Sequence, residues 1–301
     1  MEAKSQFEKQ GQKVKSNGIE IYHEAFGNAQ NPAILLIMGL DAQCVLWSMG
    51  FIEPLVEAGY YVIRFDNRDL GLSTWITDWN RSEPYTLEDM AKDAVGLLDA
   101  LHIDKAHIIG ASMGGMIAQR MAISHADRVL TLTSIMSSGY SFNPQATEKW
   151  SLKAVFSLLP FMAKRITLKN RILDNEVTVS SYVATYRSLA GTKFPFNKDY
   201  FEQLFSWSIL ERKGQNHKAR LQQLCAIIAS GSRLKEMHKI KAPTLVLHGT
   251  ADKLVPAIHA EIYAPLIPNA KIVWMDGVGH EMPLGALPQA HEEILNNLKR
   301  V

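Results

Sequence analysis

The pentapeptide Gly110-Ala111-Ser112-Met113-Gly114 decides the fold of this 301-residue chain. It directly follows the apolar run 106–109 and directly precedes the helical pattern of residues 116–123, which predicts a sharp turn between a strand and a helix. Glycines two positions on either side of Ser112 leave room for the strained backbone of such a turn. Ser112 is therefore predicted to present its hydroxyl at a helix N-terminus, where partial positive charge favours a developing oxyanion.

Around this turn the sequence alternates short apolar runs with helical stretches, a pattern typical of βαβ units stacked on a mostly parallel sheet. Asn17-Gly18 predicts a hairpin between residues 12–15 and 19–26. Further strands are predicted over residues 33–37, 61–65, 106–109, 129–135, 243–247 and 271–274. A helix begins after Thr86, because Asp89 lies three residues on and completes a capping-box pattern. The fold class is α/β.

The alternation stops between residues 140 and 240, where only helical patterns rich in aromatic residues are found. We therefore predict an α/β core over residues 1–139 and 241–301, with a helical cap over residues 140–240 between the sixth and seventh strands. Such a cap lies over the carboxyl ends of the strands, so it is expected to form a substrate pocket. The candidate pocket residues are Met38, Trp47 and Met136 from the core and Phe156 and Trp207 from the cap.

Composition excludes several classes of function. Lysine and arginine number 32 and aspartate and glutamate number 30, a net charge of +2 that is too balanced for binding to a phosphate backbone. No apolar run reaches the roughly 18 to 20 residues that span a bilayer, and the polar start resembles no export signal. Cys44 and Cys225 show no metal-type spacing. We expect a cytoplasmic protein with no nucleic-acid partner, no membrane span and no metal site.

A serine hydroxyl becomes a nucleophile only when a base takes its proton, and an acid must orient that base. Asp252 follows the predicted strand 243–247, and His280 follows the strand 271–274 in a glycine-flanked loop. These two residues are the candidate acid and base. Asp66 and Asp69 are rival acids, but they follow an earlier strand.

An oxyanion formed at this serine needs two main-chain donors. The amide of Met113, directly after the nucleophile, is the first candidate. The second is the amide of Leu40, because Gly39 lets the chain turn after the strand 33–37.

These motifs, together with residues 64–73 (Arg-Phe-Asp-Asn-Arg-Asp-Leu-Gly-Leu-Ser), resemble the α/β-hydrolase superfamily. The chain order Ser112, Asp252, His280 is that of its catalytic triad. The combination with Met38-Gly39-Leu40 is most similar to small serine carboxylesterases of the kind that includes anthracycline methylesterases. This resemblance implies an eight-stranded, mostly parallel sheet with helices on both faces, an acyl-enzyme mechanism and no cofactor. Met38 stands where the superfamily usually has histidine, and no Gly-Gly-Gly run follows, which disfavours a hormone-sensitive-lipase-like enzyme.

The predicted function is hydrolysis of short- to medium-chain or compact esters. Alternatives are another triad enzyme, such as a carbon–carbon hydrolase or a cofactor-free perhydrolase, and a non-catalytic ligand-binding member of the fold. A basic group early in the cap is typical of a solvated helix face, and the alternative is a docking site for an acidic carrier protein. This group consists of Lys149, Lys153, Lys164, Arg165, Lys169 and Arg171.

Overall fold

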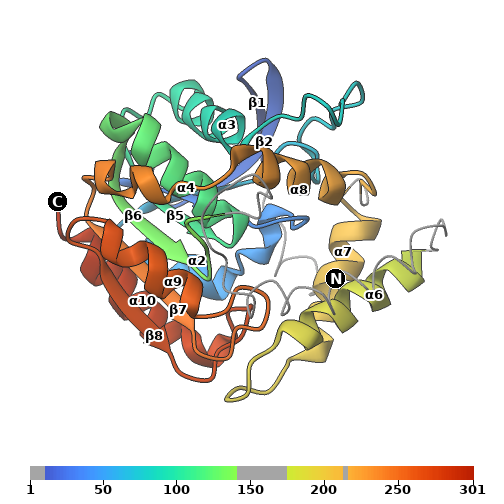
Figure 1. Cartoon of the computed structure of the whole chain (residues 1–301). Coiled ribbons are helices and arrows are strands. Elements are labelled where there is room, and N and C mark those ends of the chain that lie inside the picture. Colours follow the sequence, from blue (N-terminus) through green and yellow to red (C-terminus); the bar gives the residue numbers. More distant parts are fainter. Residues whose placement is uncertain (1–10, 141–174, 213–215) are drawn as a thin grey trace.

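The computed structural model describes residues 11–140, 175–212 and 216–301 (Figure 1). Its centre is one eight-stranded sheet in the order β1-β2-β4-β3-β5-β6-β7-β8. The strands are β1 (Gln12–Ser16), β2 (Ile19–Phe26), β3 (Ala33–Ile37), β4 (Tyr61–Phe65), β5 (Ala106–Ala111), β6 (Val129–Ile135), β7 (Thr244–Gly249) and β8 (Lys271–Met275). Strands β3 to β8 run parallel, and β1 and β2 form the antiparallel hairpin at one edge. The predicted α/β class and mostly parallel sheet are confirmed.

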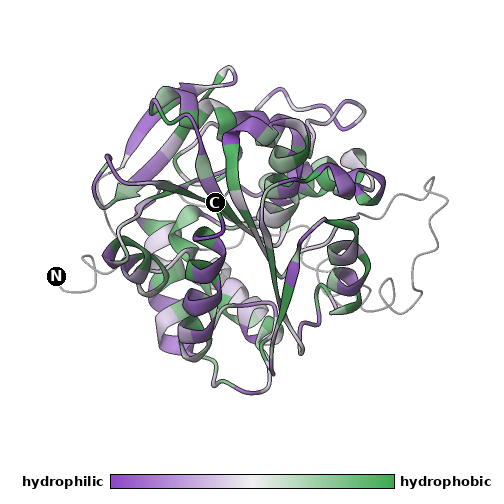
Figure 2. Cartoon of the chain, turned by 90° about the vertical axis from the view of Figure 1, so that its left-hand side faces the viewer, coloured by the Kyte–Doolittle hydropathy of each residue, from purple (hydrophilic) through white to green (hydrophobic). Residues whose placement is uncertain are grey.

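Helices cover both faces of this sheet. The core helices are α2 (Met49–Glu57), α3 (Leu87–Ala100), α4 (Met113–Ser124), α9 (Ile258–Tyr263) and α10 (Leu287–Leu298). Short 3-10 helices are η1 (Cys44–Leu46), η2 (Ala126–Arg128), η3 (Leu234–Lys239), η4 (Ala264–Leu266) and η5 (Leu284–Ala286). Helix α3 begins at the predicted capping box, in which Thr86 Oγ1 accepts from the Asp89 amide while the Asp89 carboxylate accepts from the Thr86 amide. Figure 2 shows the apolar strands between helices whose outward faces are polar.

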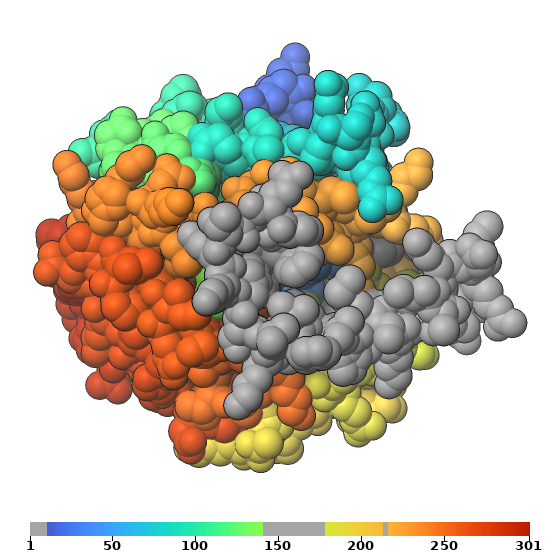
Figure 3. Space-filling model, in the orientation of Figure 1, coloured from blue at the N-terminus to red at the C-terminus, as the bar shows by residue number. Residues whose placement is uncertain are grey.

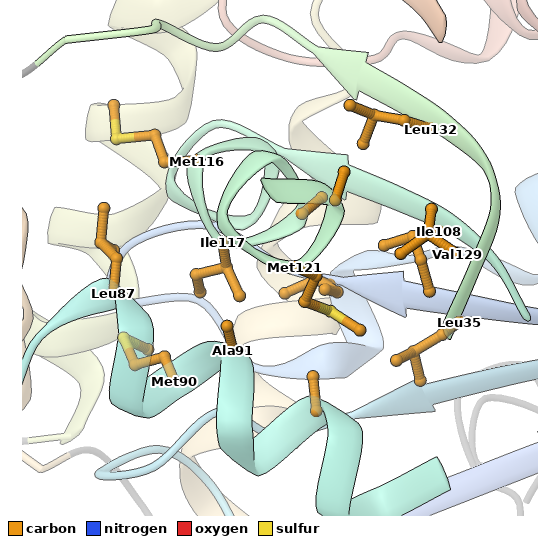
Figure 4. Packing of buried hydrophobic residues seen from close by; sticks show 14 of the residues in the cluster. Leu35, Leu87, Met90, Ala91, Ile108, Met116, Ile117, Met121, Val129 and Leu132 are labelled. Atoms are coloured by element: carbon orange, nitrogen blue, oxygen red, sulfur yellow. The ribbon is translucent and has the colours of Figure 1, made fainter. Parts of the chain in front are cut away.

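Two apolar clusters hold the layers together. On one face, Ile117 and Met121 of α4 pack between α3 and the strands that carry Leu35, Ile108 and Leu132 (Figure 4). On the other face, side chains of α2 and α10 pack on the opposite sides of the same strands. Because the central strands β3, β5, β6 and β7 are buried on both faces, their carboxyl ends are fixed relative to one another.

Between β6 and β7, the described residues 175–212 and 216–240 contain three α-helices. They are α6 (Asn175–Leu189), α7 (Lys198–Leu210) and α8 (Ala219–Ser230), and we call them the helical segment. In Figure 1 they lie together on one side of the sheet, and the space-filling view of the same side shows α6 below and α8 above (Figure 3). Ala226, Met237 and Ile240 belong to the main core cluster, so packing is continuous across residue 241. The boundaries of a separate cap over residues 140–240 stay a prediction.

None of the helices in the described ranges combines the length and apolarity needed to cross a bilayer.

Candidate active site

The turn at Ser112 joins β5 to α4. Ser112 has a φ of 55° and a ψ of −121°, a backbone conformation that residues other than glycine rarely adopt. Its amide donates a hydrogen bond to the Ile135 carbonyl at 2.9 Å. A Cβ on Gly110 would lie 2.2 Å from the Gly114 carbonyl oxygen, and one on Gly114 would lie 2.0 Å from the Ile37 carbonyl oxygen. Since neither backbone group can move away cheaply, the turn requires both glycines.

The structure brings Ser112, His280 and Asp252 together from the ends of β5, β8 and β7. His280 Nε2 lies 3.0 Å from Ser112 Oγ, and His280 Nδ1 lies 2.7 Å from Asp252 Oδ2. A carboxylate only accepts hydrogen bonds, so Nδ1 donates to Asp252 and Nε2 is left to accept from the serine hydroxyl. Asp252 and His280 are both buried. The arrangement can therefore move a proton from serine to imidazole.

Backbone groups hold both partners of Ser112. The second carboxylate oxygen of Asp252 accepts from the amides of Leu254, at 2.9 Å, and Val255, at 2.8 Å. The His280 amide donates to the Leu189 carbonyl at the end of α6, at 2.8 Å. The histidine loop is thus fastened to the helical segment.

The rival acids Asp66 and Asp69 are buried but have other partners. Asp66 accepts from the Cys44 amide at 2.8 Å and pairs with Arg212 at 3.0 Å. Asp69 accepts from the Ile76 amide at 2.6 Å and from the Tyr85 hydroxyl at 2.8 Å. Burial raises the pKa of Asp69. Both carboxylates therefore brace the loop after β4.

The loop of Met38, Gly39 and Leu40 lies beside the serine. A Cβ on Gly39 would lie 3.1 Å from Ser112 Cβ and 3.6 Å from its Oγ. Among the described residues, no hydrogen bond uses the amide of Leu40. Met113 is the first residue of α4, and the amides of a first helical turn have no acceptor within the helix. Both predicted donors thus lie on segments next to the nucleophile.

Asp41 follows this loop and is held by the helical segment. Its amide donates to Gln223 Oε1 at 2.9 Å, while its carboxylate accepts from Arg220 Nε at 2.8 Å and from the Tyr182 hydroxyl at 2.9 Å. Sequence reasoning assigned these four residues no role, because no local pattern pairs a loop acid with helices about 140 to 180 positions away.

A cavity of about 1400 Å³ opens onto Ser112 and His280. The predicted pocket residues Met38, Trp47 and Met136 line it. From the helical segment its wall includes Tyr182, Tyr186, Phe201, Leu204, Leu221 and Leu224. Phe156 and the six basic residues proposed as a carrier-docking group lie outside the described residues.

Trp207 was predicted to line the pocket, but it is not among the described residues that do. Its ring instead packs against the cluster of Tyr22, Cys44 and Leu204, with the Arg212 guanidinium 5.4 Å from its centroid. An indole ring offers a large apolar surface and a π face that attracts cations. At this position the apolar surface packs on the cluster and the π face meets the guanidinium of Arg212. The prediction for Trp207 is therefore wrong.

Glu281 also lines the cavity, directly after His280, and it is buried. Burial raises the pKa of its carboxyl to about 7. Sequence reasoning had no ground for singling out Glu281, because glutamate is among the residues least often buried without a partner.

Comparisons with known proteins bear on the family and the fold of the chain. The sequence model of the alpha/beta hydrolase fold matches residues 32–286. Over 282 residues the chain is 28% identical to the rhodomycin D methylesterase of Streptomyces peucetius, covering 90% of this chain and 92% of that protein. It is 31% identical over 229 residues to a 2-hydroxy-6-oxononadienedioate/2-hydroxy-6-oxononatrienedioate hydrolase of Paraburkholderia xenovorans, covering 68% and 64%. An esterase structure from Exiguobacterium antarcticum superposes with a TM-score of 0.75 at 20% identity, covering 96% of this chain and 100% of that one.

Proposed function

The chain belongs to the α/β-hydrolase family, and we propose that it is a serine esterase that cleaves carboxylic esters through an acyl-enzyme. The observation that carries this proposal is the hydrogen-bonded series Ser112 Oγ, His280 and Asp252, with separations of 3.0 Å and 2.7 Å. The likeness to a methylesterase supports the same class of reaction.

In this mechanism His280 Nε2 takes the proton of Ser112 as the serine oxygen attacks the ester carbonyl. Asp252 keeps the imidazole in the required tautomer and stabilises its cation. The amides of Leu40 and Met113 bind the oxyanion. His280 then protonates the leaving alcohol, and it later activates the water that releases the acid from Ser112.

The cavity supports an apolar acyl or alcohol group on the ester. Its wall is built mainly of Met, Leu and aromatic side chains, and its volume of about 1400 Å³ exceeds that of a common small-molecule pocket. Short- to medium-chain or compact esters fit this space. A methyl ester with a bulky acyl part, as the name of the Streptomyces relative implies for that protein, also fits.

A panel of p-nitrophenyl esters with rising acyl length tests the proposal. The wild type should hydrolyse butyrate-sized esters faster than triolein emulsions, and Ser112→Ala should hydrolyse none at a comparable rate. Equal turnover by wild type and Ser112→Ala would remove the basis of the proposal.

Carbon–carbon bond hydrolysis is a second candidate, favoured by the Paraburkholderia relative with its dienedioate substrate. The same triad would serve: water adds to a ketone, the adjacent carbon–carbon bond breaks to give a carboxylic acid, and the leaving carbon takes a proton. Turnover of a vinylogous diketone above that of matched esters would select this candidate.

A further inference from the structure

Glu281 stands apart from the other acids buried in the described part of the chain. Those acids are Glu24, Asp41, Asp66, Asp69, Asp93 and Asp252. Each accepts hydrogen bonds from a guanidinium, a hydroxyl or a backbone amide. Glu281 is 6% exposed, yet within the described ranges its carboxyl makes neither a hydrogen bond nor an ion pair.

The described surroundings of Glu281 are largely apolar. The residue lines the cavity and is followed in the lining by Met282, Pro283 and Leu284. Among the neighbours facing the same space is Tyr186, whose hydroxyl pKa is raised by burial and by the charges of Asp41 and Glu281. The carboxyl therefore meets an apolar, concave surface that a ligand would fill.

An unpartnered carboxyl in such a place is unfavourable. A buried polar group without a hydrogen bond loses the solvation it had in water, and an ionised one loses more. Burial accordingly raises the pKa of Glu281 to about 7. A ligand that carries a hydrogen-bond donor would remove this penalty when it binds in the cavity.

We propose that Glu281 is a substrate-binding residue, whose carboxyl accepts a hydrogen bond from an N–H or O–H donor on the ester. The donor is an aliphatic hydroxyl or a protonated amine, held one residue away from the base His280. This inference rests on the proposed esterase function and adds to it a polar requirement for the substrate. The hydrogen bond to Glu281 would thus let a largely apolar cavity select esters that carry a donor at the right position.

Three esters of similar shape test whether the substrate needs a donor. They are the p-nitrophenyl esters of trans-4-ethyl-, trans-4-(hydroxymethyl)- and trans-4-(aminomethyl)cyclohexanecarboxylic acid. A second trio carries the same substituents on the alcohol side of a butyrate ester. In at least one trio the wild type should prefer a donor-bearing ester over the ethyl ester by about 10-fold or more in kcat/KM. The hydroxyl and ammonium arms distinguish the two donors.

Variants at Glu281 test whether this residue causes the preference for donor-bearing esters. Glu281→Met should abolish it, and Glu281→Gln, which still offers an accepting oxygen, should keep part of the hydroxyl preference and lose most of the ammonium preference. Glu292→Met, at an exposed glutamate of α10, is the matched control and should keep the wild-type ratios. Equal kcat/KM values within both trios, or a preference that survives in Glu281→Met, would overturn the inference while leaving the esterase proposal intact.

A binding measurement separates the two proposals if no ester is hydrolysed. Calorimetric titration of Ser112→Ala with cyclohexylmethylamine and cyclohexylmethanol should show binding of at least one, weakened about 10-fold or more by adding Glu281→Met. Unchanged binding in the double variant would count against Glu281 whatever the activity of the enzyme.

Discussion

The two walls of the cavity are built in different ways. On the sheet side, Ser112 directly follows β5, and Asp252 and His280 lie in the loops after β7 and β8. The pairing of these parallel strands therefore helps to set the separations of the three side chains. On the other side, the helical segment presents side chains whose positions depend on how three helices rotate and pack. The proposed chemistry therefore lies in the part of the molecule with the strictest geometry, and the proposed substrate selectivity lies in the part where substitutions change the shape most freely.

The two walls are nevertheless joined by hydrogen bonds, and two sets of these bonds lie next to the candidate site. The carbonyl of Leu189 accepts from the amide of His280, and Asp41 is bound by Tyr182, Arg220 and Gln223. Movement of the helical segment would thus disturb both the base and the loop that carries Leu40. The predictions below separate the contributions of the two walls, starting with the largest effect.

Removing the nucleophile tests the sheet wall most directly. Ser112→Ala should lower kcat by at least about 10⁴-fold, because triad residues act as a unit, while circular dichroism shows the fold intact. An organophosphate should label Ser112 in the wild type and nothing in the variant. Ser188→Ala, an exposed serine of α6, is the control and should behave as wild type. Labelling at another serine would transfer the role away from Ser112.

The next largest effect on kcat is expected from the proposed acid Asp252 and base His280, in contrast to the rival acid Asp69. Asp252→Asn and His280→Ala should each lower kcat by at least about 10³-fold with little loss of stability. Asp69→Asn should instead lower the melting temperature, since Asp69 accepts from Ile76 and Tyr85, and leave kcat of the folded enzyme within a few-fold. Steady-state kinetics and thermal unfolding of the three variants check this. A large fall in kcat for folded Asp69→Asn would reverse the assignment.

The sheet side of the site could be predicted because its signals are local. Every predicted strand ends within two residues of the observed one, and Ser112, Asp252 and His280 follow such strands in a fixed order. The backbone near Ser112 was also predictable, since glycines at 110 and 114 are required by contacts of 2.2 Å and 2.0 Å.

For the helical segment, the sequence predicted helices but not which of their side chains face the cavity. In α7 the aromatic residues Tyr200, Phe201, Phe205 and Trp207 occur on several faces, so no pattern told which ones face the cavity. Trp207 was misplaced for that reason. The contacts of Asp41 with α6 and α8 and the burial of Glu281 depend on tertiary packing and leave no signal in the local sequence.

The contacts of Asp41 test the junction between the walls. Arg220→Met keeps the length of the side chain and removes the charged donor to Asp41, and kcat should fall by roughly 10-fold, the worth of one charge-assisted hydrogen bond. Tyr182→Phe should have a smaller effect, because it removes a neutral donor. The measurement is kcat on a short ester, with hydrogen exchange of α8 as a second readout. Unchanged kcat together with faster exchange in α8 would show that the junction is only structural.

Side chains of α7 test the helical wall itself. Leu204 lines the cavity, so Leu204→Ala should shift kcat/KM toward longer acyl chains, by about 3-fold to 4-fold for each methylene newly accommodated. Trp207→Phe keeps an aromatic ring beside Arg212 and should leave the chain-length preference unchanged. The p-nitrophenyl ester series measures both. A shift in Trp207→Phe equal to that in Leu204→Ala would mean that the two residues share one face of the cavity.

The last prediction concerns the stability of the resting enzyme and not its turnover. The folded-state pKa of Glu281, about 7, lies above its unfolded value, so the unfolded chain releases this proton first as the pH rises. Stability is therefore lost between about pH 4.5 and 7 and stays lower above that range. Glu281→Gln should remove this loss. Its melting temperature should match that of the wild type near pH 4.5 and exceed it by a few degrees at pH 8, which corresponds to roughly 3 kcal/mol in the free energy of unfolding. Glu292→Gln, at an exposed position, should show no such trend. Parallel unfolding curves for Glu281→Gln and wild type at both pH values would mean that the carboxyl is already satisfied in the resting enzyme.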